Sequence, residues 1–460
     1  MAVNTPNAAY SSMVDRWQTM NDVCDGSPAI KQHPYKYLPY PECDDDSKRF
    51  MQYAKRAVFY EVTKDTLQGY IGLAFSEDPT FSTDGMDFLK SNADGAGRSI
   101  YQLNQIALDG LLKNGRGGFL VDHPSVGDNI SKAQAESLGV RPVIVYYDAL
   151  SIINWRVKKV GGEYRLSLVV LKEVVNVVDA DDEFKDNSVN TYRVLRLDEE
   201  NRYSVQVYSD ESGQMIAGDL IYPTRQGKTW DIIPFTFLGS QVNDSSINDI
   251  PLEPLANLNL AHYRNSAEYE DSAFLCGQVQ PYINELDEAW RDHLEQQGVK
   301  LGSRDILMLP SGASFGFAQA NPNMVAKEAM DSKMAHMQQS GAKVLEQAIG
   351  NKTATQVDEE KSTRNSVLSL CVSNLNEANE YTLKWCADFY GGGYDAKFTI
   401  KQDFARGQVT LEELKFYNEL ALQERISWQT FHEIRTTGKI PEIDYEAEQL
   451  LIEAQRDNMT

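Results

Sequence analysis

The pattern of apolar and polar positions divides the chain into a helical start, a block of strands and a second helical block. Between Ser47 and Ile71, apolar residues recur every three or four positions, which predicts a helical stretch with one apolar face. A second helix is predicted from Ser99 to Leu112. It should end at Gly115, because glycine readily adopts the left-handed cap conformation.

After Gly118 the period of the pattern changes to two. Short β-branched segments follow one another, and the acidic stretch 198–201 reads as a turn between two of them. We therefore predict one antiparallel meander. Because the helices flank the strands in blocks, the predicted fold class is α+β. The strand segments are GFLVDH, RPVIVYYD, YRLSLVVLKEVVNVV, TYRVLRL, RYSVQVYS and IIPFTFLG.

Helices return at Ile250 and are long. One is predicted over 255–276, and another begins at Asn321-Pro322 and ends near Gly350. The intervening residues predict a strand, a helix and a strand. A third helix over 355–390 carries a heptad-like stripe, which fits contact with the rest of the chain or with a separate coiled-coil partner. Glycines end it, and one strand (KFTIKQDF) and a terminal helical block follow.

The first 46 residues differ from the rest in composition. They are rich in proline, tyrosine and aspartate, especially in the run HPYKYLPYPECDDD. Such a composition is typical of an extended segment and not of a packed element. We expect an N-terminal extended arm over 1–46 that could wrap a neighbouring molecule.

Charge and cysteine content narrow the class of protein. The 460 residues carry 44 Lys and Arg against 67 Asp and Glu, a formal net charge of −23. This balance argues against a protein whose main role is tight, non-specific binding of nucleic acid or an anionic membrane. The five cysteines have no ligand or disulfide spacing, which favours a reducing cytosol. No apolar run approaches the ~20 residues of a membrane helix, and the start lacks signal-peptide features, so we expect no membrane association.

One catalytic pattern occurs literally. Residues 312–316 read GASFG and match GxSxG, the turn that exposes a nucleophilic serine, here Ser314, between a strand and a helix. Pro310-Ser311 interrupts the preceding strand, and the next helix waits until Asn321. We therefore interpret 312–316 as a loop and keep a serine hydrolase only as a remote alternative.

Two other motifs favour plain structural interpretations. Residues 179–183 are acidic but lack the glycine and glutamate that a calcium loop needs, which favours a solvated turn. Residues 114–118 (NGRGG) follow a helix and do not open one, so they predict a helix-to-strand connection and not a phosphate site. The histidines are dispersed. The sequence thus predicts no catalytic residue, no cofactor and no metal site.

The order of predicted elements resembles that of tailed-bacteriophage portal proteins. Local runs are also similar to those of one branch of this family, over most of residues 47 to 390. These runs are KRAVFYEVTKDTLQGYIGLAFSEDP, GLLKNGRGGFLVDHP, RPVIVYYDALSIINWR, IIPFTFLGS, DIPLEPLANLNLAHYRNSAEYE and DILMLPSGASFGF.

This resemblance implies a ring, usually of twelve copies, at one capsid vertex. Double-stranded DNA would pass through it, and the terminase large subunit and then a tail adaptor would dock on it. Capsid and scaffolding proteins would be further partners, in the virion and in the host cytoplasm during assembly. The implied parts are an arm (1–46), a wing (47–254), stem helices (255–276 and 321–347), a clip (277–320), a tunnel loop (348–354), a tunnel helix with a return strand (355–405) and a crown (406–460).

The resemblance also implies two sets of candidate residues. Cations that could line the channel in rings are Lys327, Lys333, Lys343, Lys352, Lys361 and Arg364; each could equally lie on a solvated helix face or in a salt bridge between subunits. Candidates for docking of the motor or adaptor, in the clip, are Asp287, Glu288, Arg291 and Glu295. In the same segment, Trp290 is expected to be a local core anchor more than a docking residue.

A second class of function stays open. A ring-forming head-tail adaptor, or another structural protein of the particle, would share long helices and self-association but would not dock a motor. The clip discriminates between the two, because a portal needs an exposed docking surface there.

Overall fold

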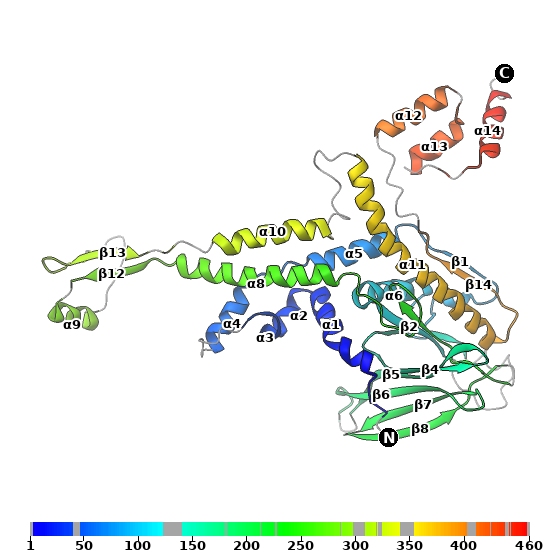
Figure 1. Cartoon of the computed structure of the whole chain (residues 1–460), viewed down its shortest axis with the longest axis horizontal. Helices are drawn as coiled ribbons and strands as arrows, with labels where there is room; N and C mark the ends of the chain where they lie inside the picture. Colours follow the sequence, from blue (N-terminus) through cyan, green and yellow to red (C-terminus); the bar gives the residue numbers. More distant parts are fainter. Residues whose placement is uncertain are drawn as a thin grey trace. The chain divides into compact units, whose positions relative to one another are not determined.

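The computed structural model describes residues 3–39, 47–122, 140–179, 182–211, 213–225, 228–285, 287–297, 309–318, 320, 324–340, 354–402, 411–423, 425–437, 441 and 443–457. In these ranges, strands β2 to β11 follow one another without an intervening helix, and most helices lie before or after this block, as the predicted α+β class requires. The chain forms two compact units (Figure 1). Unit 1 comprises 1–17, 68–251 and 348–460, and unit 2 comprises 18–67 and 252–347.

The larger sheet of unit 1 is an antiparallel meander of five strands in the order β4-β5-β6-β7-β8. The meander was predicted, and so was the turn at 198–201, where Asn201 takes a positive φ of 59° between β6 and β7. Alternate residues of β4 to β7 face the core, where Trp155, Leu195 and Tyr203 are buried. The strands are Ile152–Val160, Glu163–Val178, Asp186–Leu197, Tyr203–Glu211 and Gln214–Ile221.

The prediction of a single meander was wrong in one respect. Strands β2 (Arg116–Asp122), β3 (Val143–Asp148) and β11 (Phe235–Gly239) form a separate antiparallel sheet with the order β11-β2-β3. Its central strand, β2, pairs with β11, which follows more than a hundred residues later in the sequence. Strand patterns report local alternation but not long-range partners, so the sequence could not separate the two sheets.

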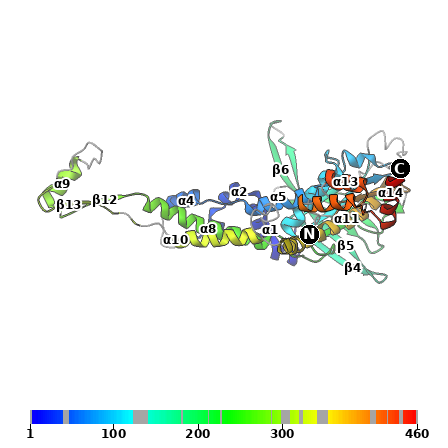
Figure 2. The ribbon, with the colours of Figure 1, turned by 90° about the horizontal axis from the view of Figure 1, so that it is seen from above.

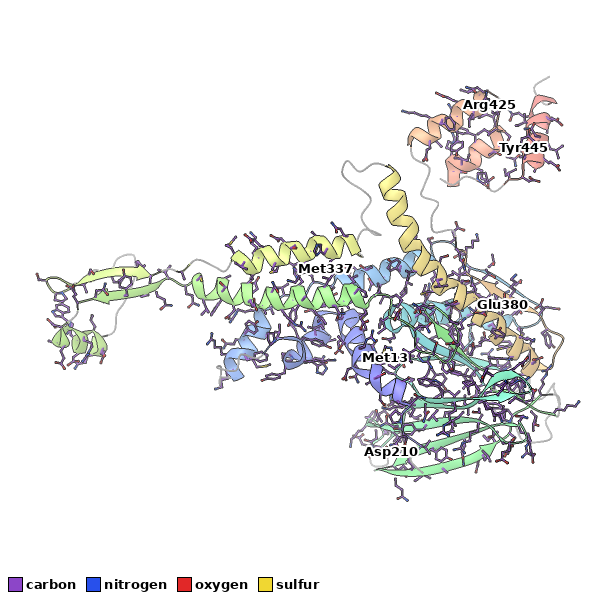
Figure 3. The ribbon with its side chains drawn as sticks, in the orientation of Figure 1. Met13, Asp210, Met337, Glu380, Arg425 and Tyr445 are labelled. Carbon is purple, nitrogen blue, oxygen red and sulfur yellow. The ribbon has the colours of Figure 1, made fainter. Side chains whose placement is uncertain are left out.

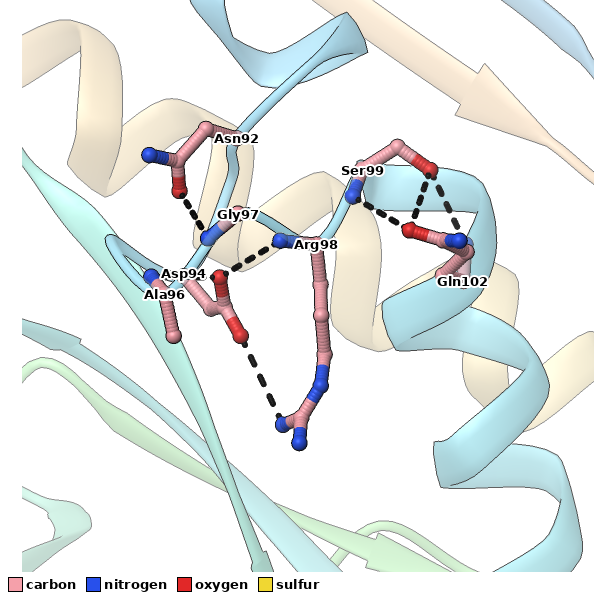
Figure 4. A network of polar contacts seen from close by, with 7 residues as sticks. All are labelled: Asn92, Asp94, Ala96, Gly97, Arg98, Ser99 and Gln102. Carbon is pink, nitrogen blue, oxygen red and sulfur yellow. Dashed lines mark hydrogen bonds and ion pairs between the residues drawn. The ribbon is translucent and has the colours of Figure 1, made fainter.

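Helix α6 (Ile100–Asn114) and its caps follow the prediction closely. The Ser99 and Gln102 side chains form a reciprocal capping box, and the preceding loop is held by Asp94, whose Oδ1 accepts the N–H groups of Ala96 and Arg98 (Figure 4). At the other end Gly115 has φ 66°. A Cβ there would lie 2.4 Å from the Asp249 carbonyl oxygen, so glycine is required both for the turn and for this close approach.

Arg116, at the start of β2, is almost fully buried, which the sequence did not indicate. Its guanidinium lies 4.2 Å from the ring centroids of both Trp155 and Phe237, and Nη1 donates to the Ser246 carbonyl oxygen at 2.6 Å. Burial lowers the pKa of this guanidinium to about 10, and the charge of Asp244 opposes the shift. The predicted helix-to-strand connection at 114–118 is confirmed.

The long helix α11 (Ala354–Tyr390) matches the predicted 355–390. Its described second half buries Leu368, Cys371 and Leu375 within unit 1, against α6, β11 and β14. This part of the stripe therefore contacts the same chain. The three glycines after Tyr390 all have positive φ and end the helix. The predicted return strand is β14 (Ala396–Thr399), which pairs with β1 (Thr80–Thr83).

Smaller elements complete the described part of unit 1. They are the 3-10 helix η1 (Asp87–Lys90), the short strands β9 (Thr224–Arg225) and β10 (Lys228–Thr229), and the terminal helices α12 (Leu411–Leu422), α13 (Trp428–Thr437) and α14 (Tyr445–Asp457). The terminal helical block was predicted, although α14 was not distinguished within it. In the described ranges, no helix has the length and apolar character needed to span a membrane.

The prediction of an extended arm over 1–46 was wrong. Residues 8 to 37 form the helices α1 (Ala8–Asp25), α2 (Ser27–Gln32) and α3 (Pro34–Tyr37). Tertiary contacts override the composition here. Trp17 is fully buried and donates its indole N–H to the Asn114 carbonyl oxygen at 2.9 Å.

The predicted helical stretch from Ser47 to Ile71 consists of two helices, α4 (Ser47–Arg56) and α5 (Val62–Ala74). The break at 57–61 has a structural cause. Side chains of a helix in unit 2 bind the backbone of this segment, as described below.

Candidate functional site

The candidate stem of unit 2 is a pair of long helices, α8 (Glu253–Cys276) and α10 (Met324–Ser340), which contact each other. Both were predicted, although the predicted N-cap of α10 at Asn321 lies outside the described residues. In α8, Glu253 and Pro254 occupy the first turn, where a negative charge and a missing N–H are both favourable. Met337 of α10 is fully buried and lies where α10 faces α8 (Figure 3).

Only the first half of α8 is a core helix. Its buried residues recur at helical spacing and end at Ala267; beyond this point every described residue of α8 is half-buried or exposed. We call 253–267 the root of α8 and 268–276 its outer half. The buried residues of the root are Leu255, Ala256, Asn259, Leu260, His262, Tyr263, Ser266 and Ala267.

Asn259 fastens the root of α8 to the segment that separates α4 from α5. Its Oδ1 accepts hydrogen bonds from Thr63 N (3.2 Å) and Thr63 Oγ1 (3.0 Å), and its Nδ2 donates to the Tyr60 carbonyl oxygen (2.8 Å). Ser266 Oγ also accepts the N–H of Val58 at 3.0 Å. Asn259 and Thr63 are fully buried, so their hydrogen bonds to each other replace the hydrogen bonds to water that these groups would make in the unfolded chain. The bonds explain why 57–61 is not helical.

At the start of the outer half, Arg56 binds an acidic patch. Its Nη2 contacts Asp271 Oδ1, and its guanidinium lies 4.3 Å from the ring centroid of Phe274. Burial raises the pKa of the nearby Tyr53 hydroxyl to about 12, and the charges of Glu268 and Asp271 act in the same direction. Arg56 was not a predicted functional residue. A cation in the last turn of a helix gives no signal in the sequence of which acidic residue it contacts.

His262 is a buried titratable group within the helix pair. Its ring contacts the Tyr60 ring at a tilt of 33°, with centroids 4.8 Å apart, and its Nδ1 has no hydrogen-bond partner among the described residues. Burial lowers the pKa of His262, the positive charge of Lys333 on α10 lowers it further, and Asp331 opposes the shift. Burial of this ring therefore disfavours its charged form in the folded protein.

Between the two helices the chain forms a small αβ element that we call the tip. Strands β12 (Gln280–Asn284) and β13 (Ser314–Ala318) pair antiparallel, and helix α9 (Glu288–Gln297) follows β12. A strand-helix-strand unit was predicted here. The strand that pairs with β12 is β13.

The interpretation of 312–316 as a loop was wrong, because Ser314 opens β13 and pairs with Asn284. The backbone does turn sharply at Gly312, which has φ 97°. A nucleophile elbow places its serine after a strand and before a helix, whereas Ser314 stands at the beginning of an antiparallel strand. In the described ranges, no group of three His, Cys, Asp or Glu side chains could hold a metal ion.

The predicted docking residues all lie on or next to α9, and all are exposed. Asp287 caps the helix, since its Oδ1 accepts the N–H of Trp290 at 2.8 Å. Arg291 Nη2 lies 3.9 Å from Glu288 Oε1, a solvated pair, and Glu295 lies one turn further along. Trp290 is half-buried and meets His293 edge-to-face with centroids 5.6 Å apart.

The structure describes the side chains of two of the six predicted channel cations. Lys327 is exposed on α10, and no ion pair involves it in the described part of the chain. Lys333 is half-buried close to His262. Lys343 and Lys352 lie outside the described residues. Lys361 and Arg364 fall within α11, but their side chains are outside the description.

An exposed apolar surface around the tip was missed by sequence reasoning. It comes from the last turn of α8, the β12–β13 ladder and the first turn of α10. Short alternating strands look alike whether their apolar side chains are covered or not, so only the structure reveals this exposure. The exposed residues are Phe274, Leu275, Val279, Tyr282, Phe317, Met324 and Val325.

Comparison with known proteins gives one family match. Residues 251–390, which contain α8, the tip, α10 and α11, match the family described as "Domain of unknown function (DUF4055)". Among curated proteins none matches the sequence.

Among solved structures, the chain is similar to components of gene transfer agent (GTA) particles. One belongs to the virion of the native particle, with 12% identity, a TM-score of 0.41, and coverage of 90% of this chain and 99% of the other. A second belongs to the neck of the empty particle computed with C6 symmetry, with 13% identity, a TM-score of 0.42, and coverage of 91% and 94%. A third belongs to the neck of the native particle computed with C12 symmetry, with 12% identity, a TM-score of 0.40, and coverage of 93% and 99%.

Proposed function

We propose that this chain is a portal-type protein. Copies of it form a closed ring at one capsid vertex, double-stranded DNA passes through the ring during packaging and ejection, and the chain acts as a structural conduit and not as an enzyme. One observation carries the proposal: a pair of long helices joined by a small αβ tip and followed by the 37-residue helix α11. This is the order of stem, clip and tunnel helix that the sequence resemblance implies.

The charges of the described helix pair suit a conduit. A channel must contact DNA without holding it, and each neutralised phosphate adds affinity through counterion release. Of the basic residues on these two helices, Arg264 donates its Nε to the Tyr37 carbonyl oxygen at 3.1 Å, and Lys333 is half-buried close to His262. Lys327 is left as an exposed cation. Coulomb attraction between solvated unit charges ~4 Å apart is only about 1 kcal/mol in water, so repeated single cations could guide DNA without stalling it.

The tip supports a portal over an adaptor that never meets a motor. The charged residues of α9 are exposed, and so are Tyr282 and Phe317 on the adjacent ladder. Aromatic anchors beside charged residues are the combination that docking surfaces use. The proposed partners there are the terminase large subunit and, after packaging, the tail adaptor. Capsid and scaffolding proteins are proposed partners of unit 1.

The tip gives a direct test of this function. Glu288→Lys combined with Glu295→Lys reverses charges on exposed side chains, so the protein should fold and form rings as wild type does. Particles that carry this variant should lose genome packaging by at least tenfold. A matched control, Glu199→Lys combined with Asp219→Lys, reverses two exposed charges on the sheet of unit 1 and should package normally. Normal packaging by the tip variant would contradict motor docking at this surface.

A further inference from the structure

In the five-stranded sheet, the end of β5 and the start of β6 extend beyond β4 and β7 as a two-stranded ribbon. Pairing of β5 with β4 ends at Leu171, and pairing of β6 with β7 ends at Thr191. Beyond these points β5 and β6 pair only with each other, from Val174 opposite Asn190 to Val178 opposite Asp186. We call residues 174–179 and 182–190 the acidic ribbon. Figure 2 shows it projecting from the rest of its sheet.

The acidic ribbon is apolar on both faces. Val174, Val175, Val177 and Val178 are all exposed, and since successive residues of a strand point to opposite faces, neither face is covered. Phe184, at its end, is 90% exposed. An isolated two-stranded ribbon is only marginally stable in water, and open strand edges with apolar side chains are typical of surfaces that another chain covers.

Charge indicates what kind of partner fits. Asp179 pairs with Lys185 at 3.2 Å. Asp182, Glu183 and Asp186 have no ion pair among the described residues, which leaves the ribbon with an excess of negative charge next to its valines. A matching surface should therefore be basic and partly apolar.

The same chain carries such a surface at the other end of β5. We call residues 156–165 the basic hairpin; it consists of the end of β4, which is an edge strand of the sheet, a Gly161-Gly162 turn and the start of β5. Arg156 and Lys159 are exposed and have no ion pair in the described part of the chain. Beside them Val157 is exposed, and Tyr164 is 77% exposed.

The acidic ribbon and the basic hairpin cannot meet within one copy. They lie at opposite ends of β5, which has 16 residues and at ~3.3 Å per residue spans about 50 Å. We propose that the acidic ribbon of one copy docks on the basic hairpin of the next. Such a contact joins two different surfaces head to tail, which is the kind of interface that closes rings. The inference rests on the ring of the proposed function and assigns the residues that join its subunits.

Charge reversal tests this contact. The acidic variant is Glu183→Lys with Asp186→Lys, and the basic variant is Arg156→Glu with Lys159→Glu. Each alone places like charges opposite each other and should lower the assembled fraction at least tenfold, as measured by light scattering at low salt. A chain with all four substitutions restores opposite charges and should assemble again. Asp219→Lys, an exposed position on the edge strand β8 of the same sheet, is the control and should assemble as wild type does.

The outcomes separate this inference from the proposed function. If wild type forms rings and both reversed variants assemble equally well, the contact is overturned and the ring stands. The same conclusion holds if the four-fold variant folds, by circular dichroism, but stays dispersed. If wild type never assembles, both proposals fail. As a second measurement, a photoreactive benzoylphenylalanine in place of Phe184 should cross-link to residues 156–165 of another copy, and a cross-link to any other segment or protein would overturn the assignment.

Discussion

The two halves of helix α8 are continuous in backbone but opposite in environment. The root, 253–267, buries eight side chains and is bonded through Asn259 to the segment between α4 and α5. The outer half and the tip have half-buried and exposed side chains, including the aromatic residues Phe274, Tyr282 and Phe317. The difference separates a buried root, which packs within unit 2, from an exposed outer half and tip, the surface to which we assign partner docking in the proposed function.

This comparison predicts how strongly substitutions in each region should affect stability. Substitutions in the root should cost the most free energy of unfolding, and substitutions in the tip should cost little while affecting docking. The following predictions run from the largest expected effect on stability to the smallest.

Asn259→Ala should have the largest effect. It leaves the buried N–H and hydroxyl of Thr63 without their acceptor and removes the hydrogen bond to the Tyr60 carbonyl oxygen, which should lower the free energy of unfolding by about 3 kcal/mol. Urea unfolding followed by circular dichroism measures this. The control is Asn265→Ala on the same helix, a half-buried position, where a change below ~0.5 kcal/mol is expected. Equal losses of unfolding free energy for Asn259→Ala and Asn265→Ala would contradict the special role of the buried Asn259 bonds.

Gly26→Ala should have the next largest effect. Gly26 precedes α2 with φ 93°, and a Cβ there would lie 2.5 Å from Glu61 Oε1, which accepts the N–H of Ser27 at 3.1 Å. We expect a loss of about 1.5 kcal/mol from backbone strain and displacement of Glu61. Gly72→Ala in α5 is the matched control, because no atom lies within 4 Å of its Cβ position, and a helical alanine should be slightly stabilising there. If the Gly26→Ala protein is as stable as wild type, the turn before α2 does not require glycine.

His262 should make the stability of the root depend on pH. Its pKa is lowered in the folded protein by burial and by Lys333, so below the reference value of 6.5 the unfolded chain binds a proton that the folded protein does not. Stability is therefore full well above that value and falls as the pH drops through it toward the lowered pKa of the folded protein. The urea midpoint should fall more steeply for wild type than for His262→Gln. Lys333→Met should make the fall shallower, and an unchanged slope in both variants would contradict the prediction.

Arg291→Ala in the tip should have the smallest effect on stability. The Arg291–Glu288 pair is long, at 3.9 Å, and both side chains are exposed, so the loss should be below ~0.5 kcal/mol. Thermal unfolding compared with wild type measures it. A loss as large as that of Gly26→Ala would mean that the tip is a stability element and not a free surface.

The sequence predicted best those elements whose signals are local. Helices α6, α8 and α11 were found by apolar period and by their end signals, as was the turn at 198–201. The partnership of β2 with β11 was missed because a strand's alternation does not name its partner. The first 46 residues were judged by composition, whereas the burial of Trp17 determines that α1 is a helix.

The candidate site was predictable in outline only. The exposed charges of α9 and the exposed Lys327 could be read as a solvated helix face from sequence. The partners of Asn259 lie about two hundred residues away, and the partner of Arg56 is equally distant, so neither could be derived. The valines of the acidic ribbon looked like an ordinary strand, since a strand with both faces buried gives the same pattern.

Electron microscopy of the purified wild-type protein tests the central claim most directly. The account predicts closed rings of identical subunits with a central channel, in negative-stain images taken at low and at high salt. Particles that remain single subunits at every concentration and salt condition would contradict it.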